Sequence, residues 1–149
     1  MSLARLLDQQ RERLAELLAL LGEEQECLVQ GQVDSEALVA LAGQKSEIQQ
    51  RLAETEARRH QVQCRLGYPD DREGTLQAAR DAGCEAAWQT TMALAREVSR
   101  ANLRCGELLA LRMEHNQRML DQIHRIANAS VYQPDGRTRL QPSRLNVSA

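Results

Sequence analysis

Residues 101–139, ANLRCGELLALRMEHNQRMLDQIHRIANASVYQPDGRTR, decide the fold of this chain of 149 residues. The stretch begins as a long helical pattern and ends in a Pro-Gly break with a basic tail. Asn102 and Asn116 share the seven-residue phase of Leu109 and Ile123. A polar group buried there without a partner is costly. The stretch therefore predicts a long amphipathic helix with two polar positions in its apolar row.

The same pattern continues toward the N-terminus and predicts one helix over residues 85–129. Apolar helical residues recur in alternating steps of three and four. The row comprises Trp88, Thr91, Ala95, Val98, Asn102, Cys105, Leu109, Arg112, Asn116, Met119, Ile123 and Ile126. At 1.5 Å per residue this helix is about 68 Å long.

Two shorter helices are expected before it, over residues 2–30 and 35–66. The first carries a leucine seam with coiled-coil spacing, with Gln10 and Glu24 as polar members. Its apolar members are Leu3, Leu7, Leu14, Leu17, Leu21 and Leu28. Gly31, followed by a capping Asp34 or Ser35, predicts a turn so short that the helices form an antiparallel hairpin.

The second seam is interrupted by polar residues. It reads Leu38, Leu41, Lys45, Ile48, Leu52, Thr55, Arg59, Val62 and Leu66. We expect the long stems of Lys45 and Arg59 to cover apolar surface while their charges reach water.

A corner follows the second helix. Gly67 can end that helix in a left-handed conformation, and Pro69 cannot continue it. A short helix is expected at residues 72–82, with Gly83 interrupting the chain and Trp88 filling the corner where the helices meet.

The predicted fold class is all-α. We expect an elongated three-helix antiparallel bundle or coiled coil with a long third helix. Residues 1–130 form a single helical domain, and residues 131–149 form a flexible basic C-terminal tail.

The helix lengths do not match. The first two helices are about 45 Å long, so about 20 Å of the third should extend past the turn near Gly31 without an intramolecular partner. Apolar residues broaden the face there, and an exposed patch of that kind marks an interaction surface. Either a partner protein or a second copy of this chain, forming a homodimeric structural coiled coil or adaptor, would cover it.

The candidate contact residues lie in this last helix and just after it. They are Asn102, Leu109, Met113, Asn116, Met119, Leu120, Ile123, Ile126 and Tyr132. The asparagines have an alternative role, because seam asparagines can fix helix register. Tyr132 is either folded back or presented to a partner.

Composition excludes several classes of function. Aromatic residues make up 2% of the chain, and the net charge of −2 argues against nucleic-acid binding. Residues 131–149 hold three basic residues and one acid, a net charge of +2, so the remaining 16 basic and 20 acidic residues carry −4. Such a tail either docks to an acidic surface or stays solvated.

Cofactor, metal and membrane signals are missing from the sequence. The four cysteines form no C-x-x-C motif and are expected to be reduced. His60 and Cys64 lie one turn apart, but two ligands do not make a structural zinc site. With no constrained nucleophile and no phosphate loop, no catalytic site is expected. No apolar run approaches the roughly 18 residues of a membrane span, so a cytoplasmic protein is expected.

Several short motifs resemble the FlgN-type flagellar export chaperones. The stretch beginning ANLRCGELLALRMEHNQRMLDQI resembles that family's N-x-x-N-G-x-L-L signature, through Asn102, Gly106, Leu108 and Leu109. VYQPDGRTR is similar to its Y-G-x-x-G segment, through Tyr132 and Gly136, and LAGQKSEIQQRL to its lysine-containing second helix. Cys105 replaces the second asparagine, and Gln133 replaces the glycine after the tyrosine.

The resemblance implies a cytoplasmic chaperone that works without a cofactor. Members bind the C-terminal amphipathic helices of the hook-filament junction proteins FlgK and FlgL, prevent premature assembly and deliver them to the flagellar type III export apparatus. The C-terminal segment would help docking to the export gate protein FlhA. A client-free homodimer is compatible with this role.

Overall fold

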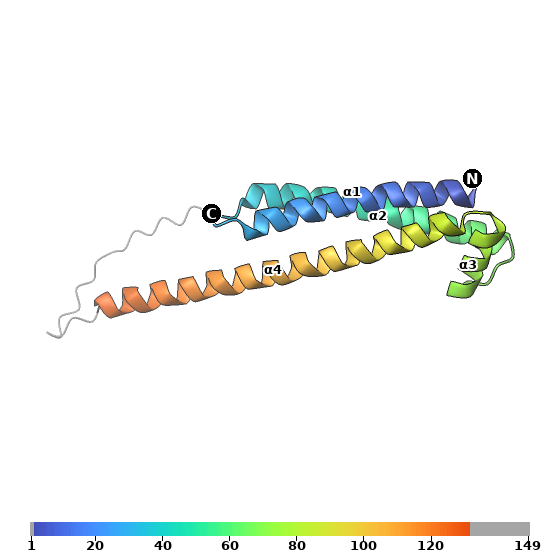
Figure 1. The fold of residues 1–149 in the computed structure, drawn as a ribbon. Helices are drawn as coiled ribbons and strands as arrows, with labels where there is room; N and C mark the ends of the chain where they lie inside the picture. The colour runs from blue at the N-terminus through green and yellow to red at the C-terminus, as the bar shows by residue number, and fades with distance from the viewer. Residues whose placement is uncertain (1, 132–149) are drawn as a thin grey trace. The chain divides into compact units, whose positions relative to one another are not determined.

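The computed structural model of this chain describes residues 2–131 and, for side chains, residues 2–129. The described residues are all-helical, as expected (Figure 1). The four helices are α1 (Leu3–Val29), α2 (Ser35–Arg65), α3 (Arg72–Asp81) and α4 (Glu85–Val131). The chain divides into two units at Leu109, so that α4 contributes to both.

Each of the first three helices begins at a polar cap. The side chains of Ser2, Asp34 and Asp71 each accept a hydrogen bond from the backbone N–H three residues later, at 3.3, 3.0 and 2.6 Å. These bonds satisfy donors that have no partner inside the helix. Of the two capping candidates for α2, Asp34 is the cap.

Glycines end α2 and α3 in the same way. Gly67 and Gly83 have φ of 84° and 70°, in the left-handed region that favours glycine. After α2, the Gly67 N–H donates to the Cys64 carbonyl and the next N–H donates to Gln63; Gly83 repeats the arrangement after α3. This pair of bonds is the Schellman motif. The predicted left-handed end at Gly67 and the break at Gly83 are confirmed.

The core of the first unit lies between α1, α2 and the first part of α4. Figure 1 shows α1 and α2 running side by side in opposite directions. Every leucine of the predicted α1 seam is buried, and Gln10 is buried with them. The main cluster comprises Leu14, Leu17, Leu21, Leu28, Ile48, Val98, Ala101 and Cys105. Each fully buried leucine contributes roughly 1.5–3 kcal/mol to folding.

A second cluster shows that three helices do not account for the core. Ala78 and Ala79 of α3 are buried against Leu3 and Leu7 of α1, with Trp88 packed beside them. Trp88 thus fills the corner, as predicted. The expected three-helix bundle is corrected to an arrangement of four helices, because α3 buries its own apolar side.

The expectation that the charges in the α2 seam reach water is wrong. Arg59 is only 5% exposed. Its guanidinium donates to Glu56 and Gln63 at 3.0 Å and lies 5.1 Å from the centre of the Trp88 ring. Lys45 is mostly buried and pairs with Glu24 at 2.6 Å. Buried charges need such partners, because desolvation is expensive. Leu66, the last predicted member of that seam, is exposed.

The C-terminal segment lies largely outside the described residues. α4 ends at Val131, so the predicted tail, including Tyr132, is not described beyond that residue. Within residues 2–131, no helix combines the length and apolarity needed to cross a bilayer.

Candidate partner-binding site

The second half of α4 carries an exposed apolar row. We use this name for Met113, Met119, Leu120, Ile123 and Ile126, all in the second unit. Their side chains are between 46% and 64% exposed. From Met113 to Ala129 every described side chain is exposed. The row is therefore an apolar surface that the described part of the chain leaves uncovered.

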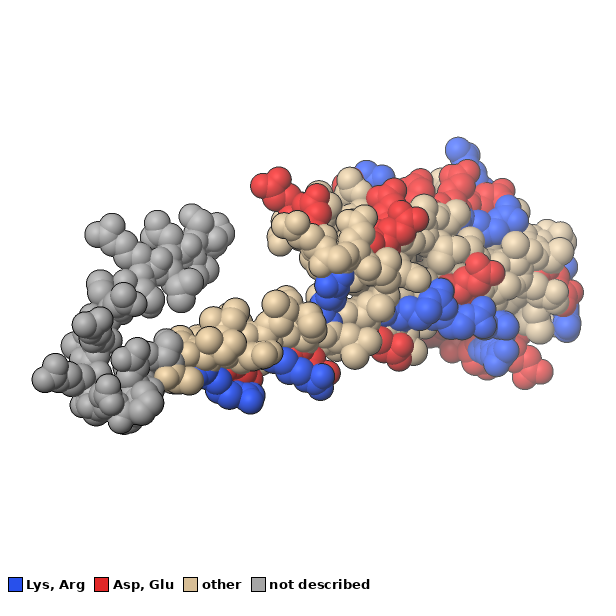
Figure 2. All heavy atoms as spheres, turned by 60° about the vertical axis from the view of Figure 1, so that its left-hand side comes forward, with Lys and Arg blue, Asp and Glu red and all other residues tan. Residues whose placement is uncertain are grey.

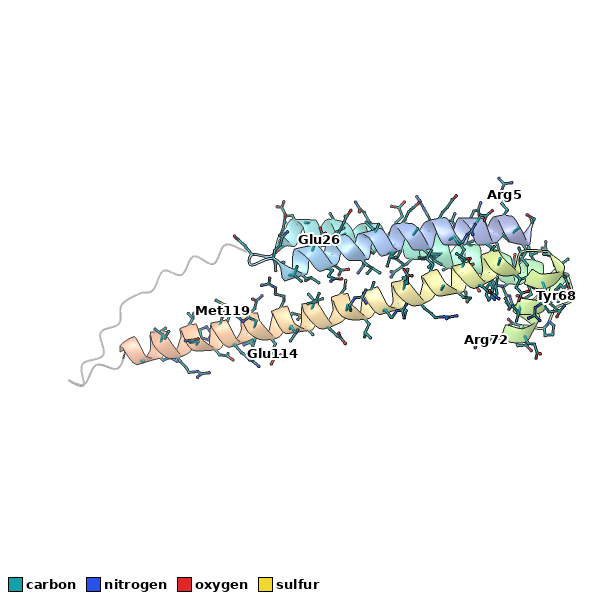
Figure 3. All side chains as sticks on the ribbon, in the orientation of Figure 1. Arg5, Glu26, Tyr68, Arg72, Glu114 and Met119 are labelled. Carbon is teal, nitrogen blue, oxygen red and sulfur yellow. The ribbon has the colours of Figure 1, made fainter. Side chains whose placement is uncertain are left out.

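The opposite side of this helical segment is charged. Arg118 pairs with Glu114 at 2.5 Å, and Gln117 donates to Asp121 at 3.1 Å. Met119 and Glu114 point to different sides of α4 in Figure 3. Figure 2 shows charged atoms along one edge of this segment and uncharged surface beside them. Such pairs support an isolated helix by about 0.2–0.5 kcal/mol each. The charged side therefore helps to keep the row helical without contributing to a core.

The two asparagines do not have the buried positions that the heptad pattern suggested. Asn102 is exposed, whereas its neighbour Ala101 is 5% exposed and belongs to the main cluster. Asn116 is also exposed. Neither amide therefore carries a burial cost, and both are accessible to a partner. Leu109, at the end of the first unit, is 43% exposed.

Cys105 faces the core rather than solvent. Its Sγ donates a hydrogen bond to the Leu21 carbonyl at 3.3 Å, and the side chain is buried. Burial raises the pKa of this thiol above its ordinary value. Buried, protonated cysteine behaves as a small apolar residue with a weak donor. This position of the motif is structural in this chain, joining α4 to α1.

The comparisons with known proteins agree on one family. The model of the FlgN protein family matches residues 1–139. The chain belongs to the FlgN family. A flagella synthesis protein FlgN of Yersinia enterocolitica is 29% identical over 133 residues, which cover 89% of this chain and 86% of that protein. No solved structure matches.

Membership in the FlgN family confirms the resemblance found in the motifs. It is a family of flagellar chaperones and not of enzymes. No cluster of three or more metal-binding side chains occurs among residues 2–131.

Two features of the first unit were not predicted from the sequence. Leu103 of α4, an apolar residue that lies off the seam, is 64% exposed. At the corner, Gln63 joins α2 to the next helix by accepting from Arg59 and Thr75, both at 3.0 Å, and by donating to the Pro69 carbonyl at 2.7 Å. The sequence signal for this network was a glutamine four residues after a seam arginine. It is too common to identify a network by itself.

Proposed function

We propose that this FlgN-family chain is a cytoplasmic flagellar export chaperone for the junction proteins FlgK and FlgL. In this proposal the exposed apolar row on α4 binds the C-terminal amphipathic helix of the client. The bound client cannot assemble prematurely and is delivered to the export apparatus. The proposal is supported chiefly by the uncovered apolar row in a chain of this family.

The physical basis is mutual burial of two apolar faces. An amphipathic helix binds a groove or face through anchors spaced three and four residues apart. Met119, Ile123 and Ile126 have this spacing and are accessible. Methionines suit more than one client because the thioether side chain is flexible. Ordering the client segment on binding costs conformational entropy, which lowers the affinity. The complex can therefore be specific and still release its cargo.

Mixing experiments with the whole chain test this proposal. We expect the chain and the C-terminal region of FlgK or FlgL to form a complex whose mass, measured by light scattering, contains both. Ile123→Glu should reduce binding at least about tenfold, because a charge would be buried against the client. Far-UV circular dichroism should show unchanged helix content, since Ile123 is 46% exposed.

A matched control places the same charge elsewhere on α4. Ala110 is exposed, and the same heptad position farther along α4 is held by Gln117 and His124. Ala110→Glu should therefore bind like the unmodified chain. A tight dimer that forms no complex with either client would contradict the proposal and favour the homodimeric coiled coil. Global unfolding of Ile123→Glu would place that residue in a core.

Docking to the export gate is a separate part of the proposal. By family resemblance, the segment around Tyr132 assists binding to FlhA. Tyr132→Ala should weaken capture of the chain by FlhA and leave the FlgK or FlgL complex intact. Loss of the client complex instead would assign this tyrosine to the client site.

A further inference from the structure

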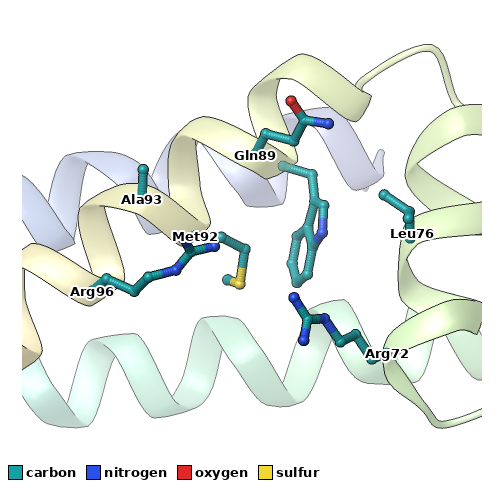
Figure 4. Close-up of a pocket in the computed structure, with 7 residues that line it drawn as sticks. Arg72, Leu76, Gln89, Met92, Ala93 and Arg96 are labelled. Atoms are coloured by element: carbon teal, nitrogen blue, oxygen red, sulfur yellow. The ribbon is translucent and has the colours of Figure 1, made fainter.

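A hollow in the first unit lies apart from the apolar row. It has a volume of about 660 Å³ between α3 and the first turns of α4. Its lining residues are Arg72, Leu76, Trp88, Gln89, Met92, Ala93 and Arg96 (Figure 4). Pockets that bind ligands have volumes of about 300–1,000 Å³. The hollow is therefore large enough to accept several side chains.

The two arginines give the hollow a positive charge. In Figure 4 the guanidinium groups of Arg72 and Arg96 point toward its middle from opposite sides. Neither has an ion-pair or hydrogen-bond partner among residues 2–131, and no carboxylate lines the hollow. Both arginines are exposed, and a guanidinium forms strong, two-pronged hydrogen bonds with carboxylates. The rim is thus complementary to acidic groups.

The remaining lining residues favour an apolar group of the ligand next to its acidic groups. Leu76, Trp88 and Met92 are partly exposed there. The indole N–H of Trp88 donates to no acceptor within the described part of the chain. Arg59 is 5% exposed and contacts the Trp88 ring, so it fixes the position of this ring next to the buried hydrogen-bond network of α2. A bare inorganic anion would use the arginines and leave the apolar wall uncovered.

We propose that this hollow binds a peptide segment of a partner protein that contains both acidic and aliphatic side chains. Its carboxylates would pair with Arg72 and Arg96, and an aliphatic side chain such as that of leucine would pack against Trp88 and Met92. This goes beyond the client site on the apolar row. It would give the chaperone a second contact, on different residues and with different chemistry.

Trp88 supplies the readout, because the chain has one tryptophan. The probe is an acetylated and amidated peptide of alternating glutamate and leucine, titrated into the full chain while indole fluorescence is recorded. We expect a saturable change in emission. The glutamine–leucine analogue, inorganic phosphate and adenosine monophosphate should bind at least about tenfold more weakly, since each lacks either the charges or the aliphatic part.

Variants separate this site from the client site. Arg72→Glu with Arg96→Glu should weaken the peptide about tenfold or more. The control pair, Arg58→Glu with Arg100→Glu, changes exposed arginines outside the hollow and should not. Ile123→Glu should keep the full peptide response.

Three results would overturn the proposal: no saturable change, equal binding of the neutral analogue, or phosphate or the nucleotide binding as tightly as the peptide. If the control pair weakened peptide binding equally, the effect would come from the net charge of the chain and not from this hollow. Because Ile123→Glu and the arginine pairs are measured separately, failure here leaves the client-binding proposal untouched, and the reverse also holds.

Discussion

Individual residues at the corner show how local chemistry and close contact determine the fold. Gly74, in the first turn of α3, lies against the backbone of Pro69. A Cβ built on Gly74 would be 2.2 Å from the Pro69 carbonyl oxygen. The sequence shows a glycine in a helix, which is ordinarily unfavourable. The structure gives the reason, since no side chain fits there.

Gly74→Ala is therefore expected to destabilise the chain by about 1–3 kcal/mol, because backbone atoms must move to relieve the overlap. Urea unfolding followed by far-UV circular dichroism measures the loss. Gly43→Ala is the control, because a Cβ at that α2 position meets nothing within 4 Å. If both variants gained stability, the close approach of Pro69 would be disproved.

Glu56 links stability to pH. The hydrogen bond from Arg59 is the main cause that holds the pKa of Glu56 below its ordinary value, although partial burial opposes it. A carboxyl with a lowered folded-state pKa adds stability above its unfolded pKa, and the contribution disappears as the pH falls through the folded pKa. The sensitive range therefore lies below about pH 4.5.

Glu56→Gln should be less stable than the unmodified chain at neutral pH, because Arg59 loses its counter-charge while remaining buried. In acid the difference should shrink, since Glu56 is then protonated in both folded and unfolded chains. Urea midpoints at about pH 7 and about pH 3 measure both values. A difference that is the same at both pH values would show that the charge of Glu56 is irrelevant.

At the scale of the element, the 47 residues of α4 fall into a part that is buried on one side and a part that is exposed all round. Thr91, Val98 and Cys105 are buried in the first unit, and the later members of the same heptad position, Met119 and Ile126, are exposed. The apolar spacing does not change, but burial does. Periodicity alone therefore predicted the heptad seam but not which part of it is core, whereas the unequal helix lengths indicated that its C-terminal part would be uncovered.

Gly106 interrupts the strong helix formers of α4 without filling a tight space. A Cβ there meets nothing within 4 Å, and the same holds at Gly22 in α1. Both Gly106→Ala and Gly22→Ala should raise the free energy of unfolding by about 0.5–1 kcal/mol. Chemical unfolding checks this. A loss of stability in Gly106→Ala alone would indicate a contact to this glycine that α4 does not make in the described chain.

For the whole molecule, the division at Leu109 separates the core from the exposed apolar row. Every buried side chain among the described residues precedes residue 106. The apolar row follows in the second unit. The buried core and the proposed client site therefore lie in different parts of the chain, and the predicted overhang of about 20 Å stays a prediction.

A chain that ends after Asn116 tests this separation. It should unfold within about 0.5 kcal/mol of the full chain, because it keeps all buried residues. It should also lose binding to FlgK and FlgL, because most of the apolar row is gone. Urea unfolding and light scattering of the mixtures measure the two effects. A shortened chain that binds its client normally would place the site within residues 2–116.

The sequence by itself determined the helices, the cap of α2 as one of two adjacent candidates, the glycine ends and the apolar row, because each depends on spacing or backbone chemistry within a few residues. Only the tertiary structure decided that Ala101 rather than Asn102 faces the core. A straight helix drifts about 20° per heptad from a strict seven-residue repeat, so packing selects among adjacent positions. Tertiary packing likewise buries Arg59 rather than leaving it solvated. Arg59 donates to Gln63, and Gln63 meets Thr75 only when α3 folds back onto α2.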